Sequence, residues 1–147
     1  MLESPDGRGR TRERENMRIA LLVVAGLALV GFLMVAVVLP QRAGAESKEA
    51  AQALVAGADP AKQQVGAVAE KAGSLSGSGN NVKIAPQNDP KHGEMKWIVA
   101  ADGQIRGWNE KNALEIAVTP ALTAGKASWN CKGYPVSAMP LSCGGRP

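Results

Sequence analysis

The chain has 147 residues, which is enough for one domain of ordinary size. Only 3% of the residues are aromatic, so a core must rely on Val, Ile, Leu, Ala and the three Trp. The net charge of +4 divides evenly: residues 1–45 carry six Arg against four acidic residues, and residues 46–147 carry eleven Lys or Arg against nine. A surplus of two positive charges on the second part is not the signature of a nucleic-acid-binding domain.

The first predicted element is a basic cytoplasmic tail, residues 1–18. Its Gly, Arg and Glu content is typical of a segment without a fold, so we expect disorder. An alternative start lies at Met17, because Met17-Arg18 directly before an apolar run would make a compact export signal.

An uninterrupted apolar run follows, Ile19–Leu39. Its 21 residues include no charged residue and no Asn, Gln, Ser or Thr. A helix of this length spans about 30 Å, the thickness of the hydrocarbon layer of a membrane. A buried helix of a soluble domain would be shorter and would carry a polar face. The run therefore predicts a transmembrane helix.

The flanking charges predict the orientation of this helix. Only Arg42 follows the run closely, whereas five arginines precede it: Arg8, Arg10, Arg12, Arg14 and Arg18. Positive flanks stay in the cytoplasm, so residues 41–147 should lie outside it. We expect a single-pass protein of the inner membrane whose C-terminal domain lies in the periplasm or the extracellular space.

The segment after the apolar run leaves two outcomes open. Ala43-Gly44-Ala45 fits the small-residue pattern of a signal-peptidase site, and it follows the helix breaker Pro40. Cleavage there would release a soluble domain that begins at Glu46. The apolar run is longer than the roughly 7–15-residue core of a signal peptide, which favours an uncleaved anchor.

Residues 46–72 are predicted to be helical. An Ala-rich stretch can end at Gly57, and Asp59 can restart the helix as an N-cap before Pro60. Alternatively, Pro60 lies inside one long helix and kinks it. Apolar residues of the second half repeat at helical spacing: Val65, Val68, Ala69 and Ala72. Gly73 suits the C-terminal cap.

After a Gly- and Ser-rich connector, residues 73–81, the pattern changes to that of strands. The candidate strands are Val82–Ala85, Met95–Ala101, Gln104–Trp108, Ala113–Thr119 and Ala127–Lys132, the fourth ended by Pro120. Asp102-Gly103 between two of them predicts a type I′ hairpin turn. A helix followed by about four antiparallel strands, packed on its apolar stripe, predicts an α+β fold for residues 46–147.

The two cysteines, Cys131 and Cys143, lie near the C-terminus. In an exported chain they predict one disulfide, whereas in a cytosolic chain they would be free thiols. The bond would close a loop of about 13 residues and contribute about 3 kcal/mol in the chain-entropy model. We expect this loop, which holds Pro135 and Pro140, to be stiff and to stand at the surface.

The sequence shows no constellation of catalytic or metal-binding residues. His92 is the only histidine and lies in a polar loop, so it predicts neither a metal site nor a general base. The connector carries Ser74, Ser76 and Ser78 without a base, and Gly73–Gly79 without the lysine of a phosphate-binding loop. We therefore expect no enzyme activity and no cofactor.

All three tryptophans lie on candidate strands, where core packing is their ordinary role. The alternative is a ligand site in which an exposed Trp97 stacks on a base or a sugar. Its cationic neighbours would be Lys96, Arg106 and Lys132. These four residues are the candidate contacts for DNA or another ligand.

The C-terminal end of the chain resembles that of type IV pilins. Ser128–Gly133 (SWNCKG) followed by Met139–Cys143 (MPLSC) is similar to the W-x-C strand and P-x-x-C loop of that family, whose cysteines pair. The resemblance extends over residues 46–143: Val118-Thr119-Pro120 resembles its L-T-P, the Asp102-Gly103 hairpin its G-x-I strand, and Ala50–Ala72 the exposed half of its spine helix.

The apolar run departs from the pilin pattern. Pilins carry Gly before the processing point and Glu as the fifth residue of the mature helix. Here the only Gly-Phe pair, Gly31-Phe32, lies inside the run, and the fifth position is Ala36. This predicts a pilin domain on an anchor of another kind.

The resemblance implies a membrane-anchored pilin-like protein of a type IV pilus system. It would act in pilus structure, pilus assembly or surface adhesion, through contacts with other pilin or pilus-assembly subunits. One alternative is a DNA- or ligand-binding receptor on the same domain. Another is an accessory protein that regulates pilins without polymerising.

Overall fold

The structure is a computed structural model that describes the backbone of residues 8–147 and the side chains of residues 16–37 and 44–147. It divides into two units, Met1–Arg42 and Ala43–Pro147. Predictions on residues 1–7 lie outside the described residues.

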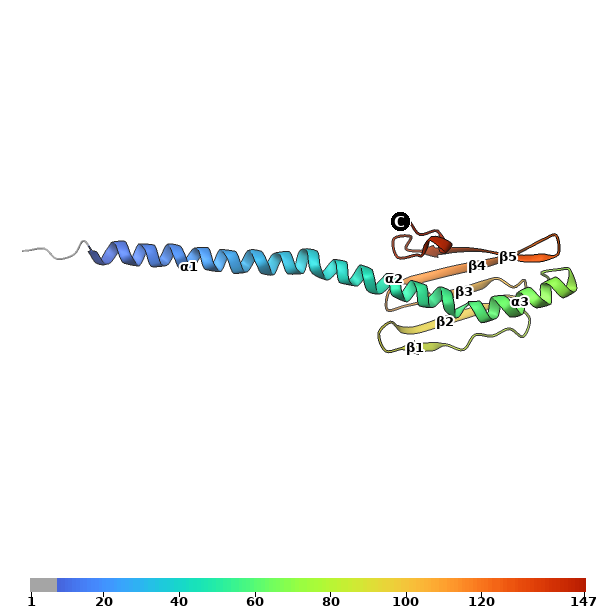
Figure 1. The fold of residues 1–147 in the computed structure, drawn as a ribbon. Coiled ribbons are helices and arrows are strands. Elements are labelled where there is room, and N and C mark those ends of the chain that lie inside the picture. The colour runs from blue at the N-terminus through green and yellow to red at the C-terminus, as the bar shows by residue number, and fades with distance from the viewer. Residues whose placement is uncertain (1–7) are drawn as a thin grey trace, which may run out of the picture. The chain divides into compact units, whose positions relative to one another are not determined.

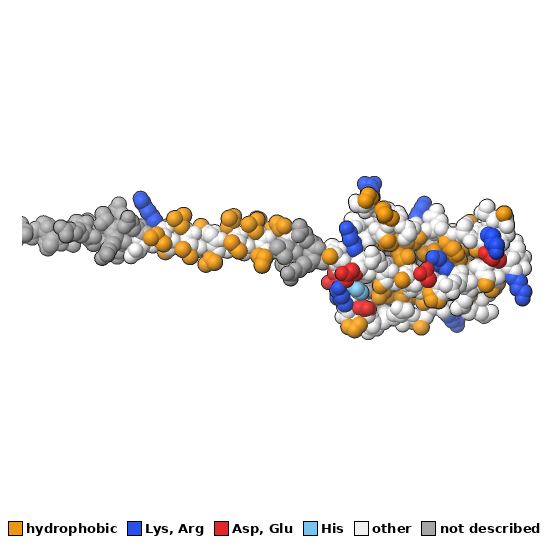
Figure 2. Space-filling view, viewed as in Figure 1, with side chains coloured by type: hydrophobic (Ala, Val, Ile, Leu, Met, Phe, Trp, Pro, Cys, Tyr) orange, Lys and Arg blue, Asp and Glu red, His pale blue; other side chains and the backbone are white. Residues whose placement is uncertain are grey.

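The first unit is helical. It consists of α1 (Arg8–Leu33), a π-helical turn (Met34–Val38) and the beginning of α2 (Leu39–Gly57) (Figure 1). Residues 8–18, for which the sequence predicts a tail without a fold, are part of α1 in the structure. The 22-residue span Asn16–Val37 is apolar, and hydrophobic side chains line its visible side (Figure 2). One helix is thus long and apolar enough to span a membrane.

The π-helical turn lies directly before Pro40. Because Pro40 has no backbone N–H, it cannot donate the α-helical hydrogen bond to the carbonyl of Ala36. Both proline and single π-helical turns mark places where the regular hydrogen bonding of an α-helix is interrupted. Pro40 therefore changes the local helix type without ending the helix, and Ala43-Gly44-Ala45 lies within α2.

The second unit is α+β, with helices packed on an antiparallel sheet (Figure 1). The sheet has five strands in chain order: β1 (Gln87–Asp89), β2 (Gly93–Val99), β3 (Ile105–Asn109), β4 (Leu114–Thr123) and β5 (Lys126–Tyr134). The predicted number of about four is wrong because the short β1 was missed. Val82–Ala85 is not a strand, since pairing with β2 begins only at Gln87, opposite Met95.

The helix break at Gly57 is confirmed, but its cap differs from the prediction. Ala58 occupies the N-cap position of α3 (Asp59–Ala72) without a side-chain hydrogen bond. Asp59 is the first helical residue instead, and its carboxylate accepts a hydrogen bond from Lys62 at 2.9 Å. At the other end, Gly73 takes the left-handed conformation and its N–H donates to the carbonyl of Ala69, as a C-terminal cap does.

The core lies between the helices and one face of the sheet. The helices and the residue between them contribute Ala50, Ala51, Leu54, Ala58, Ala61, Val65 and Ala69, and the strands contribute Met95, Trp97, Ile105, Leu114, Ile116 and Val118. The predicted apolar face of the second helix is correct in two of its four residues. Val65 and Ala69 are buried, whereas Val68 is 46% exposed and Ala72 is exposed. The buried positions repeat every four residues from Ala61.

Trp97 occupies the junction of α2 and the sheet. Its indole N–H donates to the carbonyl of Leu54 at 3.0 Å, in the last turn of α2. A Cβ atom at either Gly57 or Gly107 would overlap the indole ring. The absence of a side chain at these two positions therefore makes room for the largest residue of the core.

The β2–β3 hairpin does not contain the predicted type I′ turn. Its last antiparallel bond runs from the N–H of Ala100 to the carbonyl of Gln104 at 2.8 Å, which leaves a three-residue loop. Gly103 has φ 86°, whereas Asp102 does not enter the left-handed region. A Cβ on Gly103 would also overlap Val65 of α3. The close approach of α3 therefore places glycine at this turn.

β4 continues through Pro120, where the sequence predicted its end. It pairs with β3 only as far as Val118, but with β5 as far as Thr123. Beyond Val118 the strand has a partner on one side only, so a residue without N–H is tolerated there. Pro120 is buried and lies opposite Trp129.

The turn between β4 and β5 holds a non-glycine residue in the left-handed region. Ala124 and Gly125 form a two-residue turn with φ of 51° and 74°, typical of type I′. Asparagine tolerates this conformation better than alanine, for which it costs about 1 kcal/mol. We expect Ala124→Asn to raise the thermal midpoint by several degrees. Ala121→Asn, exposed on β4 with an ordinary φ, is the control, and an equal or larger rise for it would contradict the explanation.

The predicted disulfide is present between Cys131 of β5 and Cys143 of the 3-10 helix η2 (Leu141–Cys143). The loop that it closes does not simply stand at the surface, because Ala138, Met139 and Cys143 are buried. A Cβ on Gly133 would overlap the sulfur of Met139. The loop thus folds back over β5, and the disulfide holds it there.

Candidate interaction surface on the open face of the sheet

Side chains at alternate strand positions point away from the helices and form rows across the sheet. Strand register places Lys96, Trp108, Glu115 and Tyr134 in one row, and Ile98, Arg106, Ala117 and Lys132 in the next. We call these eight residues the open face. Because opposite residues of antiparallel strands lie about 5 Å apart, each row is a set of direct neighbours.

The open face exposes large apolar side chains. Tyr134 is 71% exposed, Ile98 is 53% exposed, and Trp108 is partly buried. Together with Arg106 and neighbouring residues they line a shallow hollow of about 500 Å³. Tyr, Trp and Arg are the residue types enriched where proteins bind proteins, so the hollow has the composition of an interface.

The charges of the open face are largely balanced. Arg106 forms an ion pair with Glu115 across β3 and β4, and Lys96 pairs with Glu94 at 3.0 Å. The hydrogen bond and the negative charge of Glu94 raise the pKa of Lys96. Lys132 has no ion-pair partner among the side chains of residues 44–147. Among the described side chains, Lys132 is therefore the one cation of the open face outside an ion pair, so the positive charge there is small.

The structure separates the four residues predicted to contact a ligand. Lys96, Arg106 and Lys132 lie on the open face, but Trp97 is 5% exposed on the opposite face of the same strand. Successive strand residues point to opposite sides, so Lys96 and Trp97 cannot share a surface. The predicted site thus lacks its stacking platform, and Trp108 is the tryptophan of the open face. Counting alternation from Arg106 would have found it.

Two ion pairs connect α2 to the turns between strands. Glu49 pairs with Lys91 in the β1–β2 turn, and Glu46 pairs with Lys111 in the β3–β4 turn at 3.0 Å. The hydrogen bond from Lys91, then its charge, lowers the pKa of Glu49. These exposed pairs connect α2 to the two turns, while the buried Ala50, Ala51 and Leu54 hold the helix on the sheet.

A buried amide links the same two turns. Asn109 is fully buried, and its Nδ2 donates to the carbonyls of His92 and Glu94 at 2.8 and 2.9 Å. Its Oδ1 accepts from the backbone N–H of Asn112.

His92 is 8% exposed, and its Nδ1 has no partner. Among the residues described, no group of three His, Cys, Asp or Glu could hold a metal ion.

Glu70 joins α3 to β5 and makes stability depend on pH. Its carboxylate accepts the N–H of Ala127 at 2.9 Å and pairs with Lys126 at 3.4 Å, and both interactions lower the pKa of Glu70. The unfolded chain then binds the proton more readily, so stability is full above the ordinary pKa of 4.5 and is lost as pH falls through the folded value.

We expect the thermal midpoint to fall as the pH is lowered from about 5 to about 3. The carboxylate of Asp89 contributes to the same fall, because the N–H groups of His92 and Lys91 lower its pKa. Glu70→Gln should flatten this dependence in a series of thermal melts, while Glu110→Gln, at an exposed turn, should not. Parallel curves for the two variants would contradict the role of Glu70.

The arrangement offers contact area and hydrogen-bonding groups. The two aromatic side chains Trp108 and Tyr134, the exposed Ile98 and the ion pairs suit reversible contact with another macromolecule. Ser78, the buried hydroxyl of the connector, donates to the carbonyl of Leu75 at 2.7 Å and has a structural role.

Comparison of the chain with protein-family models, with curated proteins and with solved structures finds no match.

Proposed function

We propose that the protein is a membrane-anchored, pilin-like component of a type IV pilus system, which acts in pilus structure, assembly or surface adhesion through protein contacts. One observation carries the proposal: a helix packed on an antiparallel sheet whose last strand is tied to the C-terminal loop by a disulfide. The resemblance to pilins supports it: Trp129 and Cys131 lie on β5, and Pro140 and Cys143 follow with the spacing of the P-x-x-C loop of that family.

The apolar helix supplies the anchor in this proposal. The span Asn16–Val37 has the length of a membrane crossing, and the arginines before it favour a cytoplasmic N-terminus. Residues from Ala43 onward would then lie in an oxidising compartment, where disulfides persist. The anchor and the disulfide therefore support the same location for the second unit.

The open face is the surface through which we expect the contacts. Its exposed Tyr134 and Ile98 flank the partly buried Trp108, and such aromatic and aliphatic groups lose water when a partner covers them. The ion pairs Arg106–Glu115 and Lys96–Glu94 would add orientation rather than affinity. In this proposal, the open face of the sheet binds the partner, and the helices pack on the other face to form the core.

The test measures where the full chain, with a tag at its C-terminus, is found after fractionation of the cells that make it, and which proteins copurify with it. The chain should be found in sheared filaments or should copurify with pilus-assembly subunits. The paired substitutions Ile98→Glu and Tyr134→Glu should reduce that association at least tenfold, which corresponds to about 1.4 kcal/mol. Gln52→Glu, on the exposed side of α2, is the control and should leave it unchanged.

The outcomes separate the alternatives. Retention in membranes, with copurifying pilus subunits but no signal in sheared filaments, would replace the filament subunit by the accessory protein. Absence of pilus components from both fractions would overturn the proposal. Equal losses for the open-face variant and for Gln52→Glu would overturn the role of the open face.

A further inference from the structure

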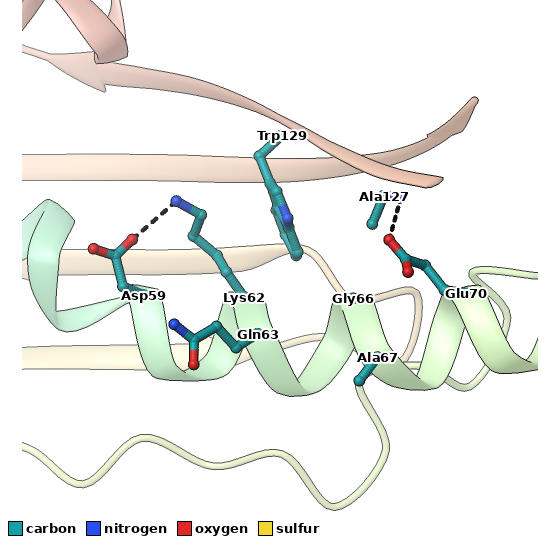
Figure 3. Close-up of a pocket in the computed structure, with 8 residues that line it drawn as sticks. All are labelled: Asp59, Lys62, Gln63, Gly66, Ala67, Glu70, Ala127 and Trp129. Atoms are coloured by element: carbon teal, nitrogen blue, oxygen red, sulfur yellow. Dashed lines mark hydrogen bonds and ion pairs between the residues drawn. The ribbon is translucent and has the colours of Figure 1, made fainter. Parts of the chain in front are cut away.

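A shallow groove lies between α3 and β5, on the side of the sheet away from the open face (Figure 3). It has a volume of about 490 Å³. Gly66 and Ala67 of α3 lie beside it, and Trp129 points from β5 toward the helix. Lys62 and Gln63 line the same groove from α3. A flat aromatic ring thus stands beside polar side chains of a helix.

Trp129 differs from the structural Trp97 in what its indole does. The N–H of Trp97 is bonded to the carbonyl of Leu54, whereas the N–H of Trp129 has no acceptor among the groups that the structure describes. Trp129 is half-buried and packs against the core, so part of its ring faces the core and part lines the groove. Trp129 therefore offers part of its ring and one free donor to a ligand.

The charged groups of the groove already have partners. Asp59 pairs with Lys62 at 2.9 Å, and Glu70 binds both the N–H of Ala127 and the ammonium group of Lys126. An anion or a cation would have to compete with these contacts. A neutral ligand that carries hydroxyl groups can instead form hydrogen bonds with the carboxylate oxygens and the ammonium group while these ion pairs stay intact. It can also bond to the exposed amide of Gln63.

We propose that this groove binds an uncharged saccharide, with one sugar ring seated against Trp129. The C–H face of a hexose ring is apolar and fits an aromatic plane, while its rim of hydroxyl groups needs both donors and acceptors. The groove supplies the plane through Trp129 and the rim contacts through Gln63, Lys62 and Asp59. This site is distinct from the open face, so it stands or fails separately from the proposed function.

The experiment uses the full chain labelled with nitrogen-15 in phospholipid micelles, because glycoside detergents would compete for the groove. Three indole N–H signals are assigned with the variants Trp108→Phe and Trp129→Phe. On addition of triacetylchitotriose or cellotriose to about 10 mM, the signal of Trp129 should shift and saturate. The signals of Trp97 and Trp108 should stay in place. The sugar that gives the lower Kd identifies whether acetamido groups contribute.

Gln63→Ala provides a test that does not disturb the core, because Gln63 is exposed. Loss of one hydrogen bond should weaken binding about threefold to tenfold. Gln52→Ala, exposed on α2, is its matched control and should bind as the original chain does. The absence of a saturable shift at Trp129 with either sugar would overturn the proposal. So would a shift centred on Trp108, or equal weakening by the two glutamine variants.

Discussion

Replacement of Trp97 by alanine is expected to lower the free energy of unfolding of the second unit by about 3–5 kcal/mol. The ring fills the space left by Gly57 and Gly107, so its removal opens a cavity that neither glycine can fill. The carbonyl of Leu54 also loses its donor at the end of α2. Domains of this size have only about 5–15 kcal/mol in total. Urea unfolding followed by circular dichroism measures the loss.

Two further variants separate the causes of this loss. Trp97→Phe keeps most of the apolar ring but removes the indole N–H, so it should cost about 1–3 kcal/mol for the unsatisfied carbonyl and the smaller volume. Trp108→Ala removes the same side chain from the open face, where little core depends on it. If Trp108→Ala cost as much as Trp97→Ala, the assignment of Trp97 to the central position would be wrong.

Local signals in the sequence predicted the elements whose ends depend on a single residue type. Both helix ends at Gly57 and Gly73 were placed correctly. Gly73 ends α3 because glycine readily adopts the left-handed conformation, whereas Gly57 is the last residue of α2 and leaves room for the ring of Trp97. The strands β2, β3 and β5 follow from β-branched and aromatic runs between turn residues. The disulfide follows from the number of cysteines and the expected compartment.

Features that depend on distant neighbours could not be predicted. β1 has only three residues and exists because β2 offers an edge. Pro120 is tolerated because β3 begins at Ile105, opposite Val118, and does not reach Pro120. The turn at Gly103 is shaped by the side chain of Val65 on another element. In each case the deciding contact joins residues far apart in the chain, which no window of sequence contains.

The open face shows the same limit at the level of a site. Tyr134 lies in the row of Lys96 only through the register of three successive strand pairs. A shift of one residue in any pair would turn Tyr134 into the core, so its exposure needs the register as well as the sequence. The alternation within one strand was available from the sequence, and it would have kept Trp97 out of the predicted ligand site.

Removal of the disulfide by the double substitution Cys131→Ala and Cys143→Ala is expected to cost about 3 kcal/mol, because the open loop of about 13 residues gains entropy in the unfolded chain. The thermal midpoint should fall by about 10 °C or more. The loss of stability should be larger than for a disulfide that closes a fully exposed loop. The reason is that this loop also carries the buried side chains of Ala138 and Met139. Thermal melts of the full chain with and without reductant measure both effects.

The loop's own contribution can be separated from that of the bond. Val136→Ala changes the loop at a residue that is 40% exposed, so it should leave the midpoint nearly unchanged. Met139→Ala in the oxidised chain removes the side chain that packs against Gly133, and should cost about 2–5 kcal/mol while the bond stays intact. If the double cysteine variant melted at the original temperature, packing of Met139 alone would hold the loop. The disulfide would then have no stabilising role in the fold, and the pilin-like assignment would lose the feature that connects its last strand to its C-terminal loop.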